Sequence, residues 1–166
     1  LGDVYKRQVY SSKTGNTKLL ADYIYKILPE KECVYLGVPD NKALKADVIF
    51  AGFWTDKGTC DDNFKDFISK IDKQSLFLFG TAGFGGSKEY FEKILSAVKE
   101  NLNPNCKLAG EFMCQGKMPI SVRKRYESMQ DSPQKQMMIS NFDRALTHPD
   151  NTDLENLKNA VLSCEF

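Results

Sequence analysis

Residues 10–17 read YSSKTGNT, and they follow the apolar Val9 at the end of a predicted strand, residues 4–10. A predicted helix, residues 17–28, comes next, with apolar side chains at helical spacing. Backbone N–H groups at the start of a helix attract an anion, and a glycine lets the backbone approach a ligand closely. The stretch therefore predicts a strand–loop–helix unit that holds a phosphate group.

This junction is rich in hydroxyl side chains, which can complete a phosphate site without an arginine. The alternative interpretation is a Ser/Thr-rich turn that only caps the helix. Hydroxyls this closely spaced between a strand and a helix favour a ligand. The predicted phosphate-binding residues are Ser11, Ser12, Lys13, Thr14, Gly15, Asn16 and Thr17.

The rest of the chain alternates apolar strands with amphipathic helices. Residues 46–52 (ADVIFAG) and 76–79 (LFLF) are continuous apolar runs, typical of buried parallel strands. The alternation predicts an α/β three-layer sandwich, in which five parallel strands in the order 2-1-3-4-5 carry helices on both faces. The other predicted strands are residues 33–36 and 107–114, and the other predicted helices are residues 61–71, a helix capped by Ser87, and a last helix that starts at a capping box in residues 152–155.

A single domain is predicted for residues 1–166. Residues 1–8 (LGDVYKRQ) are expected to be non-native, because they resemble the translation of a sequencing adapter and place polar residues in an apolar strand. Residues 117–150 weaken the pattern and contain several prolines, so they are expected to form an irregular helical insertion.

Charge and cysteine content exclude several classes of protein. The chain has 23 basic and 22 acidic residues, a net charge of +1, and lacks the basic excess of a nucleic-acid-binding protein. It also lacks an apolar run long enough for a membrane span. Five cysteines without a C-x-x-C pair, and one histidine, predict a cytoplasmic protein with no metal site and no Ser-His-Asp triad.

Residues 12–17 (SKTGNT) fit the pattern S-x-T-G-N-T, and on this motif the chain resembles the flavodoxin family. The resemblance in element order covers residues 9–114 and the last helix. It implies an FMN-binding electron-transfer domain whose motif holds the phosphate of FMN. The ATP-binding pattern G-x-x-x-x-G-K-[ST] is absent, and no G-x-G-x-x-G follows the first strand.

The resemblance also implies that the loops after the third and fourth strands contact the flavin, whose ring needs an apolar stacking surface and backbone donors. Trp54 is the first choice for the ring contact, with Phe84 and Tyr90 as candidates for a second wall; core packing is the alternative for each. Gly58 can let a peptide flip beside the flavin, or it is a simple turn glycine. The residues implied are Phe53, Trp54, Thr55, Asp56, Lys57 and Gly58 in one loop, and Thr81, Ala82, Gly83, Phe84, Gly85, Gly86 and Ser87 in the other.

Three segments, residues 52–59 (GFWTDKGT), 112–117 (FMCQGK) and 148–153 (HPDNTD), look like a flavodoxin-like branch of anaerobic bacteria. That branch includes companions of the flavin reductases of gut bilirubin reduction. Ordinary flavodoxins are strongly acidic, whereas this chain carries Lys13, Lys18 and Lys57 in or beside the predicted site. Because cations favour the anionic reduced flavin, we expect a less negative reduction potential.

The sequence thus predicts a single-domain flavoprotein that takes electrons into FMN and passes them to a partner reductase, as a monomer or weak dimer. No side chain is assigned as a general acid or base, because the cofactor carries the chemistry. One alternative is an FMN-dependent reductase of quinones or other small molecules, with the residues after Gly116 as a lid. Another is a non-redox module that binds a phosphorylated ligand or a partner protein.

Overall fold

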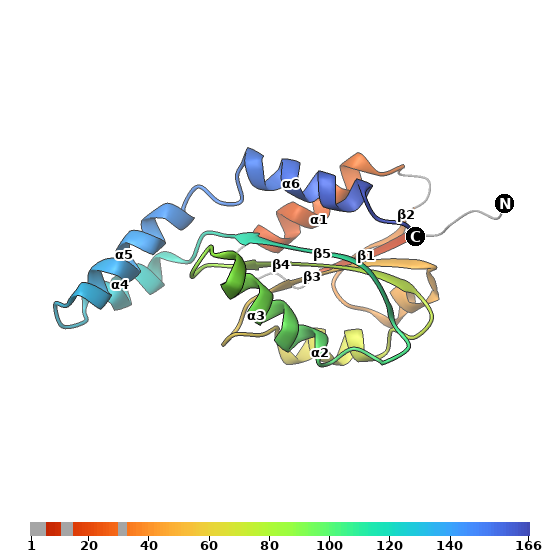
Figure 1. The fold of residues 1–166 in the computed structure, drawn as a ribbon, viewed down its shortest axis with the longest axis horizontal. Coiled ribbons are helices and arrows are strands. Elements are labelled where there is room, and N and C mark those ends of the chain that lie inside the picture. Colours follow the sequence, from red (N-terminus) through yellow and green to blue (C-terminus); the bar gives the residue numbers. More distant parts are fainter. Residues whose placement is uncertain (1–5, 11–14, 30–32) are drawn as a thin grey trace.

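The sheet is parallel throughout and runs through the middle of the molecule (Figure 1). The computed structural model describes residues 6–10, 15–29 and 33–166. Within them, five strands pair in the order β2-β1-β3-β4-β5. The α/β class, with a parallel sheet and covering helices, is confirmed. The strands are β1 (Lys6–Tyr10), β2 (Cys33–Gly37), β3 (Val48–Trp54), β4 (Ser75–Ala82) and β5 (Lys107–Gln115).

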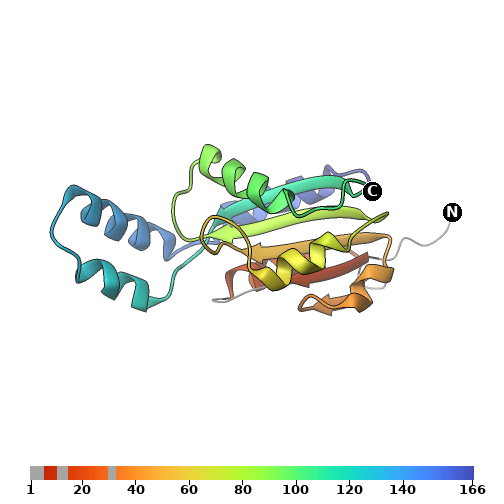
Figure 2. The same ribbon diagram turned by 90° about the horizontal axis from the view of Figure 1, so that it is seen from below.

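Helices cover both faces of this sheet (Figures 1 and 2). One face carries α1 (Asn16–Ile27) and α6 (Asn151–Leu162), and the other carries α2 (Asp62–Ser69) and α3 (Lys88–Lys99). A short 3₁₀ helix, η2 (Asn41–Lys45), connects β2 to β3. Alternate residues of a strand point to opposite faces. Phe50 accordingly packs in the core beneath α1 and α6, whereas Ile49 and Phe53 pack in the core beneath α2 and α3.

Both central strands run further than the apolar pattern indicated. Phe53 and Trp54 were expected in a loop but belong to β3, which pairs with β4 along its whole length. The strand β4 continues through Gly80 to Ala82, where a glycine-rich loop was expected. A side chain at Gly80 would overlap the ring of Phe53, so glycine is required here by close packing rather than by a loop.

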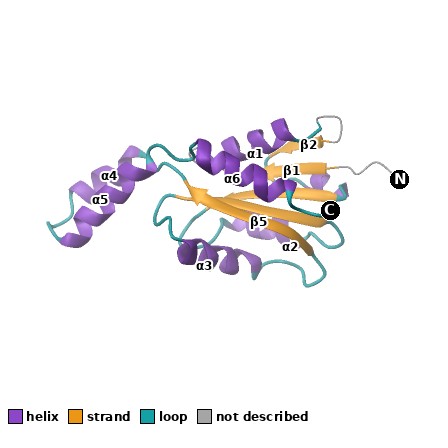
Figure 3. Cartoon of the chain, turned by 45° about the horizontal axis from the view of Figure 1, so that its top comes forward, coloured by secondary structure: helices purple, strands orange, loops and turns teal. Residues whose placement is uncertain are grey.

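Residues 117–150 form a regular helical hairpin, whereas an irregular insertion was expected. The helices α4 (Ile120–Glu127) and α5 (Pro133–Ala145) lie side by side and project away from the sandwich (Figures 1 and 3). Arg123 of α4 joins them by a two-pronged ion pair with Asp143 of α5, with N···O distances of 3.0 and 3.1 Å. Pro133 opens α5 at a position where a helix tolerates proline, because the first N–H groups have no helical partner. We call this unit the α4–α5 hairpin.

The cap of α6 also differs from the expected one. The predicted capping box began at Thr152, but the N-cap is Asp150, whose side chain accepts the N–H of Asp153 at 2.9 Å. Asp153 in turn accepts the N–H of Asp150 and is bonded to the ring of His148, at 2.9 and 2.6 Å. The box therefore sits two residues earlier than predicted, with Asp153 as its N3 residue. Among the helices that the structure describes, none combines the length and apolar character needed to cross a membrane.

Candidate functional site

A cavity of about 690 Å³ lies at the carboxyl ends of β3 and β4, where open parallel sheets bind their ligands. This volume is in the range of small-molecule sites, roughly 300–1,000 Å³. Five parts of the chain line it: the start of α1, the end of β3 with the turn that follows, the end of β4 with the loop that follows, the first turn of α3, and the α4 region. We call it the main cavity. Its lining residues are Asn16, Trp54, Thr55, Asp56, Lys57, Gly58, Thr81, Ala82, Gly83, Phe84, Tyr90, Lys117, Met118, Pro119, Ser121, Val122, Arg125 and Tyr126.

The start of α1 brings a helix N-terminus to this cavity. Gly15 is the N-cap, with a φ of 89° and no side-chain cap bond, and the first turn contains no acidic side chain. Asn16 lines the cavity, and its Nδ2 donates to the carbonyl of Lys117 at 2.8 Å. The positive end of the helix dipole and the lack of an acidic side chain in the first turn suit an anion here. Four of the predicted phosphate-binding residues, Ser11, Ser12, Lys13 and Thr14, lie outside the described residues.

Thr17 was predicted to bind the phosphate, but the structure buries it beneath the site. Its Oγ1 donates to the carbonyl of Phe53 at 3.0 Å and lies 3.0 Å from the hydroxyl of Thr81. Thr55 donates both its N–H and its hydroxyl to the carbonyl of Thr81, at 3.0 and 2.8 Å. These bonds tie α1, β3 and β4 together at one point. Thr17 therefore positions the site in this structure and does not line it.

The turn after β3 has a fixed shape. Asp56 and Thr59 bond through both backbone groups, with N···O distances of 2.7 and 3.1 Å. Lys57 and Gly58 between them have φ values of 51° and 83°. Two positive φ values in a two-residue hairpin define a type I′ turn, and glycine adopts such angles at little cost. Gly58 thus sits in a turn and has the positive φ that glycine permits, and a peptide flip beside a flavin stays a prediction.

Trp54 lines the cavity, and a hydrogen bond to Asp61 holds its indole in place. Its Nε1 donates to Oδ2 of Asp61 at 3.0 Å. Asp61 is also the N-cap of α2, because its Oδ1 accepts the N–H of Phe64 at 2.8 Å. Phe53, predicted beside it in the site, is instead fully buried in the core and packs on Phe64 with ring centroids 5.7 Å apart. Its side chain cannot reach a ligand in the main cavity.

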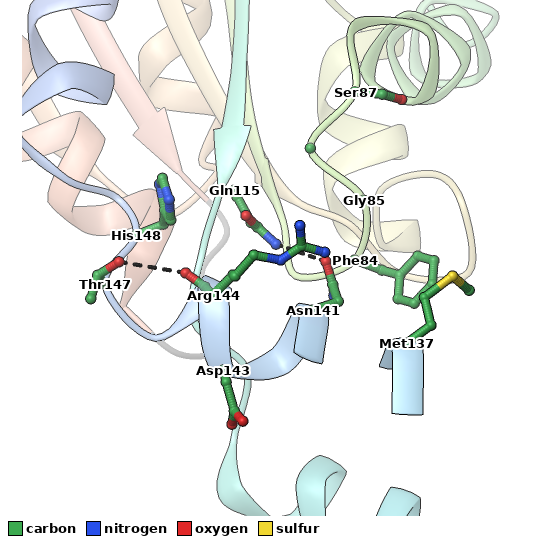
Figure 4. A pocket seen from close by; sticks show the side chains of 11 residues that line it. Phe84, Gly85, Ser87, Gln115, Met137, Asn141, Asp143, Arg144, Thr147 and His148 are labelled. Atoms are coloured by element: carbon green, nitrogen blue, oxygen red, sulfur yellow. Dashed lines mark hydrogen bonds between the residues drawn. The ribbon is translucent and has the colours of Figure 1, made fainter. Parts of the chain in front are cut away.

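The loop after β4 divides between two spaces. Thr81, Ala82, Gly83 and Phe84 line the main cavity, as predicted for a ligand loop. Gly85, Gly86 and Ser87 instead line a neighbouring space of about 910 Å³, which we call the second cleft (Figure 4). Phe84 lines both. The remaining residues of the second cleft are Gln115, Met137, Asn141, Asp143, Arg144, Thr147 and His148.

Aromatic side chains supply much of the apolar lining of the main cavity. Phe84 and Tyr90, both candidates from the sequence, lie edge to face with ring centroids 6.3 Å apart and an interplanar angle of 71°. Burial raises the pKa of the Tyr90 hydroxyl, which therefore stays neutral at physiological pH. Tyr126 is a third ring of the lining, and the guanidinium of Arg125 lies 5.9 Å from its ring centroid. Together with Trp54 these rings form an apolar surface suited to a flat ligand.

Sequence reasoning named the residues after Gly116 only as a lid in one alternative function and assigned none of them to the site. Met118 packs so closely on Gly83 that a side chain added at Gly83 would overlap it. The helix α4 carries few apolar residues and buries only Tyr126, so hydrophobic spacing gave no signal for it. The close approach of this region to α1 is visible only in the structure, where a side chain added at Gly116 would overlap that of Asn16. The missed lining residues are Lys117, Met118, Pro119, Ser121, Val122, Arg125 and Tyr126.

Basic side chains outnumber acidic ones in the lining of the main cavity. Lys57, Lys117 and Arg125 line it, against one carboxylate, that of Asp56. Lys18, named as a neighbouring cation from the sequence, does not line it and pairs with Asp22 at 2.9 Å. The described lining therefore carries a net positive charge, which favours an anionic ligand.

Comparison with known proteins agrees with this architecture. The family model of the flavodoxin domain matches residues 8–162. A flavodoxin-like domain-containing protein, BilS of Clostridium symbiosum (strain WAL-14163), is 39% identical over 176 residues, which cover 93% of each chain.

Solved structures show the same fold at lower identity. The two-electron reduced flavodoxin of Megasphaera elsdenii has a TM-score of 0.53 and 19% identity, over 84% of this chain and 99% of that one. A flavoprotein of Lactobacillus acidophilus NCFM, solved in complex with FMN, has a TM-score of 0.51 and 14% identity, over 67% of this chain and 93% of that one. On the family model and the curated relative together, the chain is a member of the flavodoxin domain family.

Proposed function

We propose that this protein binds FMN in the main cavity and passes electrons to a partner reductase. One observation carries the proposal: the main cavity lies at the carboxyl ends of β3 and β4, between a helix N-terminus and several aromatic rings. Membership of the flavodoxin domain family supports FMN as the cofactor. FMN, when bound, supplies reversible electron transfer that no amino-acid side chain provides.

The residues of the cavity fit the parts of FMN. Its phosphate needs donors and positive potential, which the start of α1 at Gly15 and Asn16 offers, together with the hydroxyls predicted in residues 11–14. Its ring needs flat apolar walls, which Trp54 and Tyr90 offer. Gly83 presents its backbone at the wall without a side chain of its own.

Several contacts organise these walls before any ligand enters. Asp61 fixes the indole of Trp54, and the Thr17–Thr81 contact fixes the ends of β3 and β4 relative to α1. A preorganised cavity loses less conformational entropy on binding, so affinity rises without added contacts. Lys57 and Arg125 add positive charge, which we expect to stabilise the reduced, more negative flavin.

Absorption spectroscopy tests FMN binding most directly. The purified protein, titrated with FMN and separately with riboflavin, should bind FMN far more tightly, because only FMN carries the phosphate. The double variant Thr14→Val/Gly15→Ala should weaken FMN and leave riboflavin nearly unchanged. Failure of the wild-type protein to take up FMN would exclude the proposal and favour the non-redox module.

A second candidate function is reduction of quinones or other small molecules by bound FMN. The observation that favours it is the α4 region, which lines the main cavity opposite the strands, as a lid over a substrate does. Steady oxidation of NADH or NADPH by the isolated protein with a quinone would support the enzyme. Reduced protein that reoxidises rapidly only when a partner reductase is added would support the carrier.

A further inference from the structure

The second cleft has a chemistry of its own that FMN binding does not use. It lies beyond the loop after β4, between that loop and the end of α5, and has a volume of about 910 Å³ (Figure 4). Only Phe84 belongs to both the cleft and the main cavity. A molecule in the cleft would therefore contact the same ring that borders the flavin site.

Arg144 gives the cleft a cation that makes no ion pair with the residues that the structure describes. It stands in the last turn of α5, and Figure 4 shows its side chain reaching into the cleft. The adjacent Asp143 is occupied by Arg123, which binds both of its carboxylate oxygens. Within residues 6–10, 15–29 and 33–166, the guanidinium of Arg144 makes no ion pair and no hydrogen bond. Its planar donors match a carboxylate in two-pronged fashion.

His148 forms a fixed wall beside this cation. Its Nδ1 lies 2.6 Å from a carboxylate oxygen of Asp153, which holds the ring and directs the Nδ1 proton toward the carboxylate. The Thr147 hydroxyl donates to the carbonyl of Arg144 at 3.4 Å, and the N–H of His148 donates to the carbonyl of Ala145 at 3.0 Å. These bonds keep the chain after α5 turned toward the cleft.

The opposite wall is apolar and exposed. Phe84 and Met137 are 37% and 55% exposed, although both line a concave surface. Between the walls, Gln115 and Asn141 bond to each other at 3.0 Å, and both donate to the carbonyl of Gly83. Both the oxygen and the nitrogen of the Asn141 amide thus have partners. The Gln115–Asn141 pair, which lies between the two walls, is therefore held in one arrangement.

We propose that the second cleft binds a small aromatic carboxylic acid. The carboxylate would pair with Arg144, and the ring would lie on Phe84 and Met137. A singly charged head fits better than a phosphate, because Arg144 is the one cation without an ion pair among the described residues that line the cleft, while Asp143 lines it and Asp150 and Asp153 lie beside His148.

The probe for the test is 2-naphthoate, a flat fluorescent acid, titrated into the full-length protein by calorimetry with and without saturating FMN. Binding that persists with FMN present places the acid outside the main cavity. Arg144→Gln should raise the dissociation constant at least about tenfold, the cost of a lost charged hydrogen bond. Lys124→Gln removes another exposed positive charge, on α4, that lines neither space, so it should leave 2-naphthoate binding unchanged.

Two further comparisons test the charged contact and the apolar contact separately. Neutral 2-naphthamide should bind more weakly than 2-naphthoate, and 2-naphthyl phosphate should not bind better. Met137→Ala should weaken the acid and the amide alike, because it removes part of the apolar wall. If Arg144→Gln fails to fold, Arg144→Lys keeps the charge and loses the two-pronged geometry, so an intermediate loss is expected.

Each contrary result overturns the proposal. These are displacement of 2-naphthoate by FMN, equal weakening in Lys124→Gln, tighter binding of the phosphate or the amide, and no binding at millimolar concentrations. The apoprotein is also measured, so a failure to bind FMN leaves the result for the cleft readable. Unchanged FMN affinity in Arg144→Gln shows that the variant is folded and that the two sites are separate.

Discussion

The hydroxyl oxygens of Thr17 and Thr81 lie 3.0 Å apart in the core, and Thr17 also donates to the carbonyl of Phe53. Because the single proton of Thr17 goes to Phe53, Thr81 must be the donor to Thr17. The start of α1 is thus bonded to β3 and β4 at the level of the main cavity. Thr17 takes part in two of these hydrogen bonds and the Thr81 hydroxyl in one, so substitutions of the two residues should have different effects.

Thr17→Val should destabilise the fold more than Thr81→Val. The first change leaves Thr81 without its acceptor and Phe53 without this donor, a cost of about 1–3 kcal/mol, whereas the second removes one bond worth about 1 kcal/mol. Free energies of unfolding from urea titration measure both. The double variant should cost less than the sum, because the two residues share a bond. Strict additivity would contradict the network.

Asp61→Ala should both weaken α2 and change the fluorescence of the only tryptophan. Asp61 caps the helix through one oxygen and holds Nε1 of Trp54 through the other. Loss of an N-cap costs about 1 kcal/mol, and the freed indole should shift its emission. Asp40→Ala removes the cap of η2 far from Trp54 and is the control. A similar emission shift in that control would remove the support for the indole contact.

Gly83→Ala should disturb the contact between β4 and the α4 region. The new methyl group would overlap Met118, and relief of such overpacking costs about 1–3 kcal/mol. Met118→Ala in the same chain should restore much of the stability, because it removes the overlapping side chain. Thermal unfolding of the single and double variants is the measurement. A double variant less stable than Gly83→Ala alone would speak against the contact.

Lys57→Glu should lower the reduction potential of bound FMN. Reversing one charge at the rim of a water-facing cavity changes the energy by about 1 kcal/mol, or roughly 20 mV for a two-electron couple. Potentiometric titration followed by absorbance measures the shift. Lys73→Glu makes the same charge change just before the amino end of β4, whereas the cavity lies at the carboxyl end of that strand. This control should leave the potential unchanged. Equal potentials in wild type and Lys57→Glu would refute the role of Lys57.

The cap of α6 predicts a particular loss of stability in acid. The pKa of the Asp150 carboxyl is held below its usual range, chiefly because it accepts the backbone N–H of Asp153. The folded state therefore binds its proton less readily, so this stabilisation is present above the ordinary pKa of about 3.9 and is lost as pH falls through the lowered value.

Asp150→Asn should remove that dependence. The difference in free energy of unfolding between wild type and variant should be large near neutral pH and shrink below pH of about 4. Asp62→Asn alters an exposed carboxylate of α2 outside any cap bond and serves as the control. A difference that stays constant across the acid range would show that the Asp150 charge does not stabilise the cap.

The sequence predicted the elements whose burial follows from their own composition. The apolar runs around Ile49 and Leu78 are buried on both faces, so a parallel strand was the only good interpretation. The end of β4 was misread, because Gly80 usually signals a loop; here it makes room for Phe53, a contact between residues far apart in the chain. Hydrophobic spacing and residue type along the chain do not reveal contacts between residues that are far apart in sequence.

The sequence predicted the site residues near the ends of β3 and β4. It did not predict the residues of α4, which are far from them in the chain but line the same cavity. Trp54 and Phe84 were named because the resemblance to the flavodoxin family implied flavin contacts near the ends of β3 and β4. Met118 and Arg125 were not, because α4 is polar and only its tertiary position brings it to the cavity. The split of the loop after β4, which sends Gly86 to the second cleft, likewise depends on where α5 ends.

The α4–α5 hairpin leaves and rejoins the sandwich at one place. The N–H of Lys117 donates to the carbonyl of His148 at 3.1 Å, so the two ends of the excursion are already adjacent. A linker of a few residues could bridge them without rebuilding any strand. We expect that exchanging the hairpin among related chains would change the lining of both the main cavity and the second cleft while leaving the parallel sheet as it is.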